Sequence, residues 1–163
     1  MKSILDMCCG SKMFWYDRQN PDVEFCDIRT ETHELCDGRQ LIIAPDRIED
    51  FRSLSFENEQ FDIVVFDPPH LVRAGDNSWM KHKYGRLDKE AWPQDIAAGF
   101  SEARRVLRGG GTLVFKWNET QIPVSRVVAL TGGWHPLITQ RVGKNDKTHW
   151  MIFYKGRNDG KDS

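Results

Sequence analysis

Short apolar runs recur along the chain at regular intervals, separated by polar or helix-compatible segments. Four of them have the length and the β-branched and aromatic content of buried strands, at residues 3–7, 23–27, 62–66 and 112–117. Alternation of short strands with helices is typical of α/β folds built on a mostly parallel sheet. The pattern therefore predicts an α/β fold without internal repeats.

The strand between 23–27 and 62–66 has two candidates. Residues 47–51 are one, and the apolar run Leu41-Ile42-Ile43-Ala44 competes with them. The strand at 62–66 has a clearer end, because the prolines of Asp67-Pro68-Pro69 cannot donate to the sheet ladder. The sequence thus leaves two possible locations for the third strand, whereas it defines the end of the fourth.

Three segments are predicted to be helical. Residues 12–18 are compatible with a helix after the first strand. A longer helix begins at Pro93, a residue suited to the first helical turn, and ends at Leu107 before three glycines. Its apolar side chains share one face: Ile96, Phe100, Ala103 and Leu107. The third segment, 123–131, ends at a glycine pair.

The remaining segments complete the predicted domain. Strands are expected at 134–141 and 149–154, and the polar, basic and aromatic stretch 71–90 is expected to be a long loop, since it shows no sustained period. The polar end, 156–163, is expected to be disordered. A length of 163 residues suits one domain of ordinary size, which we place at 1–155.

The composition is that of a globular protein, with 39% hydrophobic and 29% charged residues. The apolar runs are too short to span a bilayer, and the first residues lack the apolar stretch of a signal peptide. We therefore expect a cytoplasmic protein with no membrane partner. The net charge of -1 gives no overall basic field, so a nucleic-acid substrate would need a local basic patch.

The four cysteines, Cys8, Cys9, Cys26 and Cys36, are predicted to be free thiols, because disulfides are rare in the cytosol. With His33 they could be assembled into a zinc site. That site would lack a paired C-x2-C spacing and would take its ligands from unrelated loops. We therefore predict no metal.

Acidic residues end three early strands, at Asp6, Asp27 and Asp50. The carboxyl ends of the strands line the ligand crevice in a doubly wound sheet. Gly10 lets the backbone approach a ligand, and an acid after the second strand can accept both hydroxyls of a ribose. This combination suits a nucleoside-containing cofactor. Strand-terminal acids also occur as solubilising caps, so these residues alone leave both interpretations open.

The sequence Asp67-Pro68-Pro69-His70 suggests a reaction at an amino nitrogen. An exocyclic aromatic amine is a poor nucleophile because its lone pair is delocalised into the ring. The Asp67 carboxylate and the Pro68 carbonyl can each accept one N–H hydrogen bond and aim that lone pair at an electrophilic methyl group. The prolines fix the backbone, and His70 offers a flat face for a base. A Pro-Pro turn after an ordinary acid is the alternative.

The order of these motifs is similar to that of class I S-adenosylmethionine-dependent methyltransferases, over roughly residues 3–155. It most resembles the branch that modifies amino groups, whose motif is Asp/Asn-Pro-Pro-aromatic. Five segments carry the resemblance: Leu5-Asp6-Met7-Cys8-Cys9-Gly10, Asp27, Asp50-Phe51, Phe66-Asp67-Pro68-Pro69-His70 and Arg105-Val106-Leu107-Arg108-Gly109-Gly110-Gly111. The resemblance implies a Rossmann-like sheet of seven strands in the order 3-2-1-4-5-7-6, mostly parallel with strand 7 antiparallel, flanked by helices.

The same resemblance implies S-adenosyl-L-methionine as cofactor and assigns residues to it by position. The loop from Met7 to Gly10 would wrap the methionine part, Asp27 would hold the ribose, and Phe51 would contact the adenine. The full cofactor set would be Asp6, Met7, Cys8, Cys9, Gly10, Asp27, Ile28, Asp50 and Phe51. The catalytic set would be Asp67, Pro68, Pro69 and His70.

Two positions depart from the family pattern. Cys8 stands where the first loop usually carries glycine. His70 stands where Tyr, Phe or Trp is more usual, so stacking would be weaker and a polar contact is open.

Candidate substrate-binding residues follow the catalytic motif: Trp79, Lys81, Lys83, Arg86, Lys116 and Trp117. The first four interleave positive and aromatic side chains, as does a loop that grips phosphates and stacks bases. A solvated lid is the alternative for this loop. Lys116 could contact a phosphate, and Trp117 could wall the pocket or belong to the core.

The leading functional hypothesis is methylation of adenine N6, or of cytosine N4, in DNA or RNA, with the nucleic acid as partner. The same motif could act on a protein side-chain amide or a small-molecule amine. A third hypothesis is a non-catalytic cofactor-binding subunit, against which the intact Asp67-Pro68-Pro69 argues. DNA versus RNA, the target sequence and the oligomeric state stay open.

Overall fold

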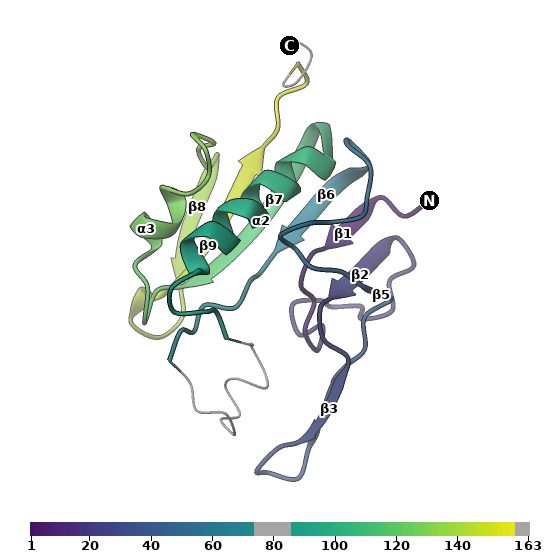
Figure 1. Ribbon diagram of the computed structural model, residues 1–163, viewed down its shortest axis with the longest axis vertical. Coiled ribbons are helices and arrows are strands. Elements are labelled where there is room, and N and C mark those ends of the chain that lie inside the picture. Colours follow the sequence, from purple (N-terminus) through teal and green to yellow (C-terminus); the bar gives the residue numbers. More distant parts are fainter. Residues whose placement is uncertain (74–85, 159–163) are drawn as a thin grey trace.

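The computed structural model describes residues 1–73 and 86–158. Seven strands of this part of the chain form one sheet in the order β5-β2-β1-β6-β7-β9-β8 (Figure 1). Their bounds, in that order, are Arg47–Ile48, Val23–Asp27, Ile4–Asp6, Phe61–Phe66, Leu107–Asn118, Thr148–Tyr154 and Ile138–Val142. β9 is antiparallel to both of its neighbours, and the other pairs are parallel. Counted along the chain within this sheet, the order is 3-2-1-4-5-7-6, so the predicted Rossmann-like topology is confirmed.

A separate two-stranded sheet lies between β2 and β5 in the chain. It pairs β3 (Glu31–Glu34) with β4 (Gln40–Ile43) in antiparallel register and projects from the main sheet (Figure 1). The two runs that competed for the third strand therefore both form strands. Residues 47–48 complete the main sheet, whereas the run at 41–44 belongs mostly to this hairpin.

Helix α2 (Trp92–Val106) lies across one face of the sheet (Figure 1). Its buried side chains include Ile96, Phe100 and Ala103, which the helical spacing predicted for the inner face. The helix also comes very close to β6 at Gly99, where an added Cβ would overlap the ring of Phe66. Glycine at this position therefore sets how closely the helix packs on the sheet.

Two further short helices connect the last strands. Helix α3 (Val124–Val128) occupies the middle of the predicted segment 123–131. The 3-10 helix η1 (Lys144–Asp146) joins β8 to β9. The glycines after α2 do not simply end the helix, because β7 begins at Leu107 and passes through them. Gly110 has a φ of 86°, and the pairing of β6 with β7 shifts register here.

The predicted helix at 12–18 is wrong, because this segment forms a series of turns. Lys12 has a left-handed φ of 61°, which interrupts a right-handed helix. Trp15 anchors the turns through long-range contacts. Its indole N–H donates to the Asp6 carboxylate at 2.6 Å, and its ring packs edge-on against Phe25, with centroids 5.4 Å apart. Tertiary contacts thus override the local helix propensity.

The main core lies between the sheet and α2. Phe66, Phe100, Phe115 and Phe153 pack there as a continuous aromatic cluster. On the other face, the turns after β1 cover part of the sheet through Trp15. Within the described ranges, no helix is long and apolar enough to cross a membrane.

Candidate functional site

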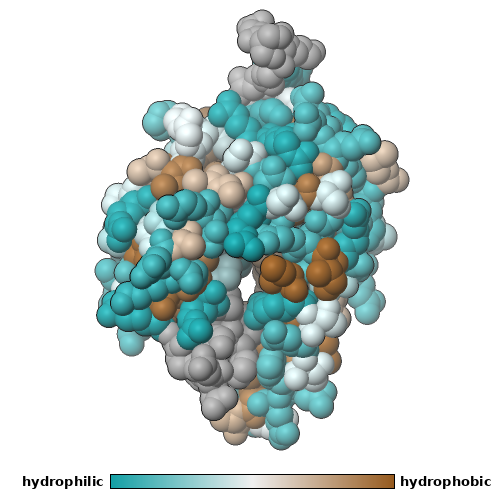
Figure 2. Space-filling view, in the orientation of Figure 1, coloured by the Kyte–Doolittle hydropathy of each residue, from teal (hydrophilic) through white to brown (hydrophobic). Residues whose placement is uncertain are grey.

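The carboxyl ends of β1, β2 and β6 open into one cavity of about 360 Å³. Because these three strands are neighbours in the sheet, the acids that end or follow them converge there: Asp6, Asp27 and Asp67. The volume lies within the ~300–1,000 Å³ that is usual for ligand pockets. The space-filling view shows an opening near the middle of this face of the molecule (Figure 2).

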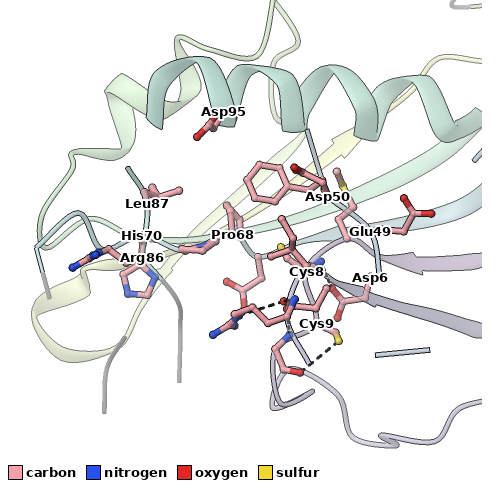
Figure 3. A pocket seen from close by; sticks show the side chains of 18 of the residues that line it. Asp6, Cys8, Cys9, Glu49, Asp50, Pro68, His70, Arg86, Leu87 and Asp95 are labelled. Carbon is pink, nitrogen blue, oxygen red and sulfur yellow. Dashed lines mark hydrogen bonds and ion pairs between the residues drawn. The ribbon is translucent and has the colours of Figure 1, made fainter. Parts of the chain in front are cut away.

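The cavity collects most of the residues that the sequence singled out. All nine predicted cofactor residues line it: Asp6, Met7, Cys8, Cys9, Gly10, Asp27, Ile28, Asp50 and Phe51. The four predicted catalytic residues and two of the substrate candidates line it too: Asp67, Pro68, Pro69, His70, Arg86 and Lys116. Figure 3 shows His70, Arg86 and Leu87 at one end, Glu49 and Asp50 at the other, and Asp95 above on α2.

The other substrate candidates are not found in the cavity wall. Trp79, Lys81 and Lys83 lie outside the described residues. Trp117 is fully buried, and its indole N–H donates to the Ile122 carbonyl at 3.0 Å. Trp117 is therefore a core residue, which corrects its proposed place in the pocket wall.

Asp6, at the end of β1, fixes the start of the loop from Met7 to Gly10 by hydrogen bonds. Its carboxylate accepts hydrogen bonds from the Trp15 indole at 2.6 Å and from the Cys8 backbone N–H at 3.2 Å. Burial is the largest cause that raises the pKa of Asp6, the nearby carboxylates of Asp67 and Asp27 add to it, and the two hydrogen bonds oppose it; the net result is a pKa of about 7. The site therefore contains an acid that titrates near neutral pH.

Asp27 connects the end of β2 to the first loop. One carboxylate oxygen accepts the Gly10 N–H at 2.8 Å, and the other accepts the Arg29 N–H at 2.9 Å and its Nε at 3.3 Å. A carboxylate offers about four acceptor positions, so three are already in use. A ribose hydroxyl bound here would share the carboxylate with Arg29 or displace it.

The far end of the cavity carries a flat apolar surface and an ion pair. Phe51 lines the cavity and packs on Phe66, with ring centroids 5.2 Å apart. Asp50 accepts hydrogen bonds from Arg52 Nε at 2.9 and 3.0 Å, and these bonds lower its pKa. Arg52 also reaches Asp95 on α2 at 3.4 Å. This end can therefore hold a planar ring between Phe51 and polar groups.

The predicted catalytic motif, residues 67–70, follows directly from β6. Burial raises the pKa of Asp67 to about 6, against the opposing effect of the Lys116 ammonium. Burial and the same lysine lower the pKa of His70 to about 4, so its imidazole is neutral at pH 7. The His70 ring lies edge-on to Trp117, with centroids 6.2 Å apart. Asp67 is thus mostly ionised at pH 7, beside a neutral histidine.

The departure from the family pattern at Cys8 has a physical explanation here. Cys8 is not among the described residues with a positive φ, so its position does not require glycine, whereas Gly10 has a φ of 52°. Burial raises the pKa of the Cys8 thiol well above its usual value, so it adds no charge beside the three carboxylates. A thiol is therefore compatible with this loop.

Sequence reasoning missed nine further residues of the cavity wall: Ser11, Met13, Phe14, Arg29, Glu49, Arg52, Leu87, Asp88 and Asp95. Met13 and Phe14 reach it because the segment after Gly10 turns instead of forming a helix. Ser11 has a buried hydroxyl without a hydrogen-bond partner in the described part of the chain. Such a group is available to a ligand. Arg29 and Arg52 could have been found from the sequence, because each stands two positions after a predicted cofactor aspartate and can bind its carboxylate.

Neither a protein-family model nor a curated protein sequence matches this chain. Solved structures match over nearly all of it. A protein from Pyrococcus horikoshii is 17% identical, with a TM-score of 0.60 over 94% of this chain and 81% of that chain. A SAM-dependent methyltransferase from Methanosarcina mazei is 12% identical, with a TM-score of 0.54 over 94% and 92%. The N-methyltransferase NodS from Bradyrhizobium japonicum is 13% identical, with a TM-score of 0.57 over 95% and 86%. These likenesses show that the chain has the fold of S-adenosylmethionine-dependent methyltransferases.

Proposed function

We propose that this protein is an S-adenosylmethionine-dependent methyltransferase that acts on an exocyclic amino nitrogen, with adenine N6 in DNA or RNA as the preferred target and cytosine N4 as the second. The observation that carries the proposal is the position of Asp67. It follows β6 and lines the same cavity as Asp6, which ends the adjoining strand β1, and Asp27, which ends the next strand, β2. A carboxylate for the amine thus lies beside the residues proposed for the cofactor.

The charges of the cavity favour a cationic cofactor. The buried carboxylates of Asp6 and Asp27, with Asp67, surround the space next to the first loop. A sulfonium and an ammonium group are attracted by these carboxylates, whereas the pyrophosphate of a dinucleotide would be repelled. Gly10 and Ser11 lie where the backbone and a hydroxyl can contact the methionine part, and Phe51 lies where adenine can pack. The residues present therefore fit S-adenosylmethionine.

Methyl transfer to such an amine depends more on the position of its lone pair than on a general base. When bound, the cofactor supplies a methyl group activated by its sulfonium. The Asp67 carboxylate and the Pro68 carbonyl accept the two N–H hydrogen bonds of the target amine and direct its lone pair towards that methyl group. Positive charge develops on the nitrogen during attack, so the carboxylate binds the transition state more tightly than the neutral amine. As the C–N bond forms, the bond from the methyl group to the cofactor sulfur would break, and the methylated nitrogen then gives its proton to solvent water.

Lys116 has two effects at this site. Its position in β7 is next to Asp67, because Phe115 pairs with Phe66 in the adjoining strand. Its charge lowers the pKa of Asp67 and so favours the ionised carboxylate. It can also contact a phosphate of the target strand. Whether Arg86 and the loop residues Trp79, Lys81 and Lys83 bind the same strand stays a prediction.

A protein side-chain amide or a small-molecule amine is the second candidate for the methyl acceptor. Among the described residues that line the cavity, seven are acidic and four are Lys or Arg. This balance does not attract a polyanion by itself. It favours an acceptor without phosphates unless the loop beyond His70 supplies the missing positive charge.

The proposal is tested by incubating the protein with labelled S-adenosylmethionine and separate pools of DNA, RNA and protein, followed by nucleoside analysis. We expect label in N6-methyladenine or N4-methylcytosine, and far less of it with Asp67→Ala after the same short incubation. Label confined to the protein pool would contradict the nucleobase target. A folded protein that does not bind S-adenosylmethionine would contradict the methyltransferase itself.

A further inference from the structure

The turns after β1 bring an aromatic ring to the catalytic end of the cavity. Phe14 lines the cavity, and its ring lies 4.9 Å from that of Trp150, at an interplanar angle of 43°. Trp150 belongs to β9, which lies beyond β6 and β7 in the sheet order. Phe14 therefore reaches from the first loop across the end of β6, where Asp67 is located.

Trp150 is held on this face of the sheet by Lys116. The two residues are partners in the antiparallel pairing of β7 with β9, so their side chains point to the same face. The Lys116 ammonium lies over the Trp150 ring, 5.3 Å from its centroid. Trp150 is not part of the cavity wall, whereas Phe14 and Lys116 are. Trp150 thus packs against both Phe14 and Lys116 from outside the cavity.

The position of Phe14 separates it from the proposed adenine site of the cofactor. That site lies at the Glu49–Asp50 end of the cavity, near β5, and Figure 3 shows it away from His70. Phe14 instead contacts Trp150 of β9, on which the Lys116 ammonium also lies. A planar group that enters beside Asp67 would therefore meet the Phe14 ring.

The motif at residues 67–70 lacks a large aromatic side chain on which a base could stack. His70 stands where the related motif has a larger aromatic side chain, and its own ring already packs edge-on to Trp117. Stacking on an aromatic side chain stabilises a bound base by roughly 1–3 kcal/mol. We propose that Phe14 is the surface on which the target base stacks, and that Trp150 is a positioning residue that holds Phe14 there. This subsite accepts a planar heterocycle and rests on the proposed function.

The test compares KM and kcat for a single-stranded oligonucleotide of mixed sequence, as DNA and as RNA, with the Kd for S-adenosylmethionine. Phe14→Leu keeps an apolar side chain and removes the aromatic face. We expect it to raise KM by about five- to 150-fold and to change the cofactor Kd by less than about twofold. Phe14→Tyr should restore most of the affinity. Trp150→Leu should behave like Phe14→Leu, and Trp150→Phe should restore binding.

Tyr16 provides a matched control, since it is an aromatic residue of the same turns and is fully exposed. Tyr16→Leu should leave KM unchanged. The inference is overturned if wild-type protein methylates the oligonucleotide and Phe14→Leu has the same KM as Tyr16→Leu. It is also overturned if Phe14→Leu weakens cofactor binding and leaves KM unchanged. Wild-type protein that methylates only a protein substrate would refute the nucleobase function and this subsite together, because an amide has no aromatic face.

Discussion

Binding of the proposed cofactor is expected to release protons from the carboxylates of the cavity. Burial raises the pKa of Asp6 to about 7 and that of Asp67 to about 6. At about pH 6.5 these groups are roughly three-quarters and one-quarter protonated, so together they carry about one proton. A sulfonium and an ammonium beside them lower both pKa values, because an opposite charge favours the ionised form. We therefore expect up to about one proton released per cofactor bound at pH 6.5, and almost none at about pH 8.5.

The assay is calorimetry of S-adenosylmethionine binding in buffers of different ionisation enthalpy. The dependence of the measured heat on the buffer gives the number of protons released. S-adenosylhomocysteine lacks the sulfonium charge and should release fewer protons. Asp6→Asn should remove most of the release, whereas Asp17→Asn, at an exposed aspartate of the following turns, should not. Equal proton release at both pH values would refute the reasoning, because it would show that these carboxylates do not respond to the cofactor.

The same pKa shift has a consequence for the free protein. The folded-state pKa of Asp6 lies above its ordinary value of 3.8. The folded state therefore binds more protons than the unfolded state between these values, and this contribution to stability is lost as pH rises through about 7. The lowered pKa of His70 acts in the opposite direction between about 4 and 6.5. Asp67, whose pKa is raised to about 6, acts in the same direction as Asp6 and has largely lost its proton above about pH 6.5. The fall in stability between about pH 6.5 and 7.5 is therefore due mainly to Asp6.

Three further substitutions test separate parts of the account. Asp27→Ala should weaken S-adenosylmethionine binding by about 1.5–3 kcal/mol, the scale of hydrogen bonds to a charged group; unchanged affinity in calorimetry would remove Asp27 from the site. Lys155→Met should lower the free energy of unfolding in urea by about 1–3 kcal/mol, because the buried Lys155 ammonium donates to the carbonyls of Arg104 and Leu107 at the end of α2; an unchanged urea midpoint would show that this cap is not needed. Gly99→Ala should destabilise the fold by about 1–3 kcal/mol, since the added methyl group would overlap the Phe66 ring; equal thermal stability would mean that α2 moves away without cost.

The main strands and the convergence of Asp6, Asp27 and Asp67 could be predicted from the sequence pattern, whereas the order of the sheet was implied by the resemblance to class I S-adenosylmethionine-dependent methyltransferases. Short buried runs define the strands, and the carboxyl ends of adjoining parallel strands meet at one edge. The conformation of residues 12–18 could not be predicted in the same way, because it depends on long-range contacts. The segment 12–18 is compatible with a helix by composition, but the Asp6–Trp15 hydrogen bond holds it in turns. This is why Phe14 was not foreseen in the cavity.

Other details depend on partners that no local pattern reveals. The run at 41–44 has the composition of a sheet strand, yet residues 40–43 pair with Glu31–Glu34 in a separate hairpin. Trp117 lies near the end of the apolar strand β7, and both a core and a pocket position were compatible with that. Its indole hydrogen bond to the Ile122 carbonyl places it in the core. The occupation of Asp27 by Arg29 and Gly10 likewise appears only in three dimensions.

The most direct test of the account is single-turnover methyl transfer by variants of Asp67 at about pH 8, with cofactor saturating. The carboxylate is proposed to stabilise the positive charge that develops on the target nitrogen. Asp67→Ala should therefore transfer the methyl group roughly 10²–10³-fold more slowly than wild type, while the cofactor Kd changes far less. Asp67→Asn should fall in between, because its oxygen still accepts a hydrogen bond without a full charge. A folded Asp67→Ala protein, checked by circular dichroism, that transfers methyl at the wild-type rate would contradict the account.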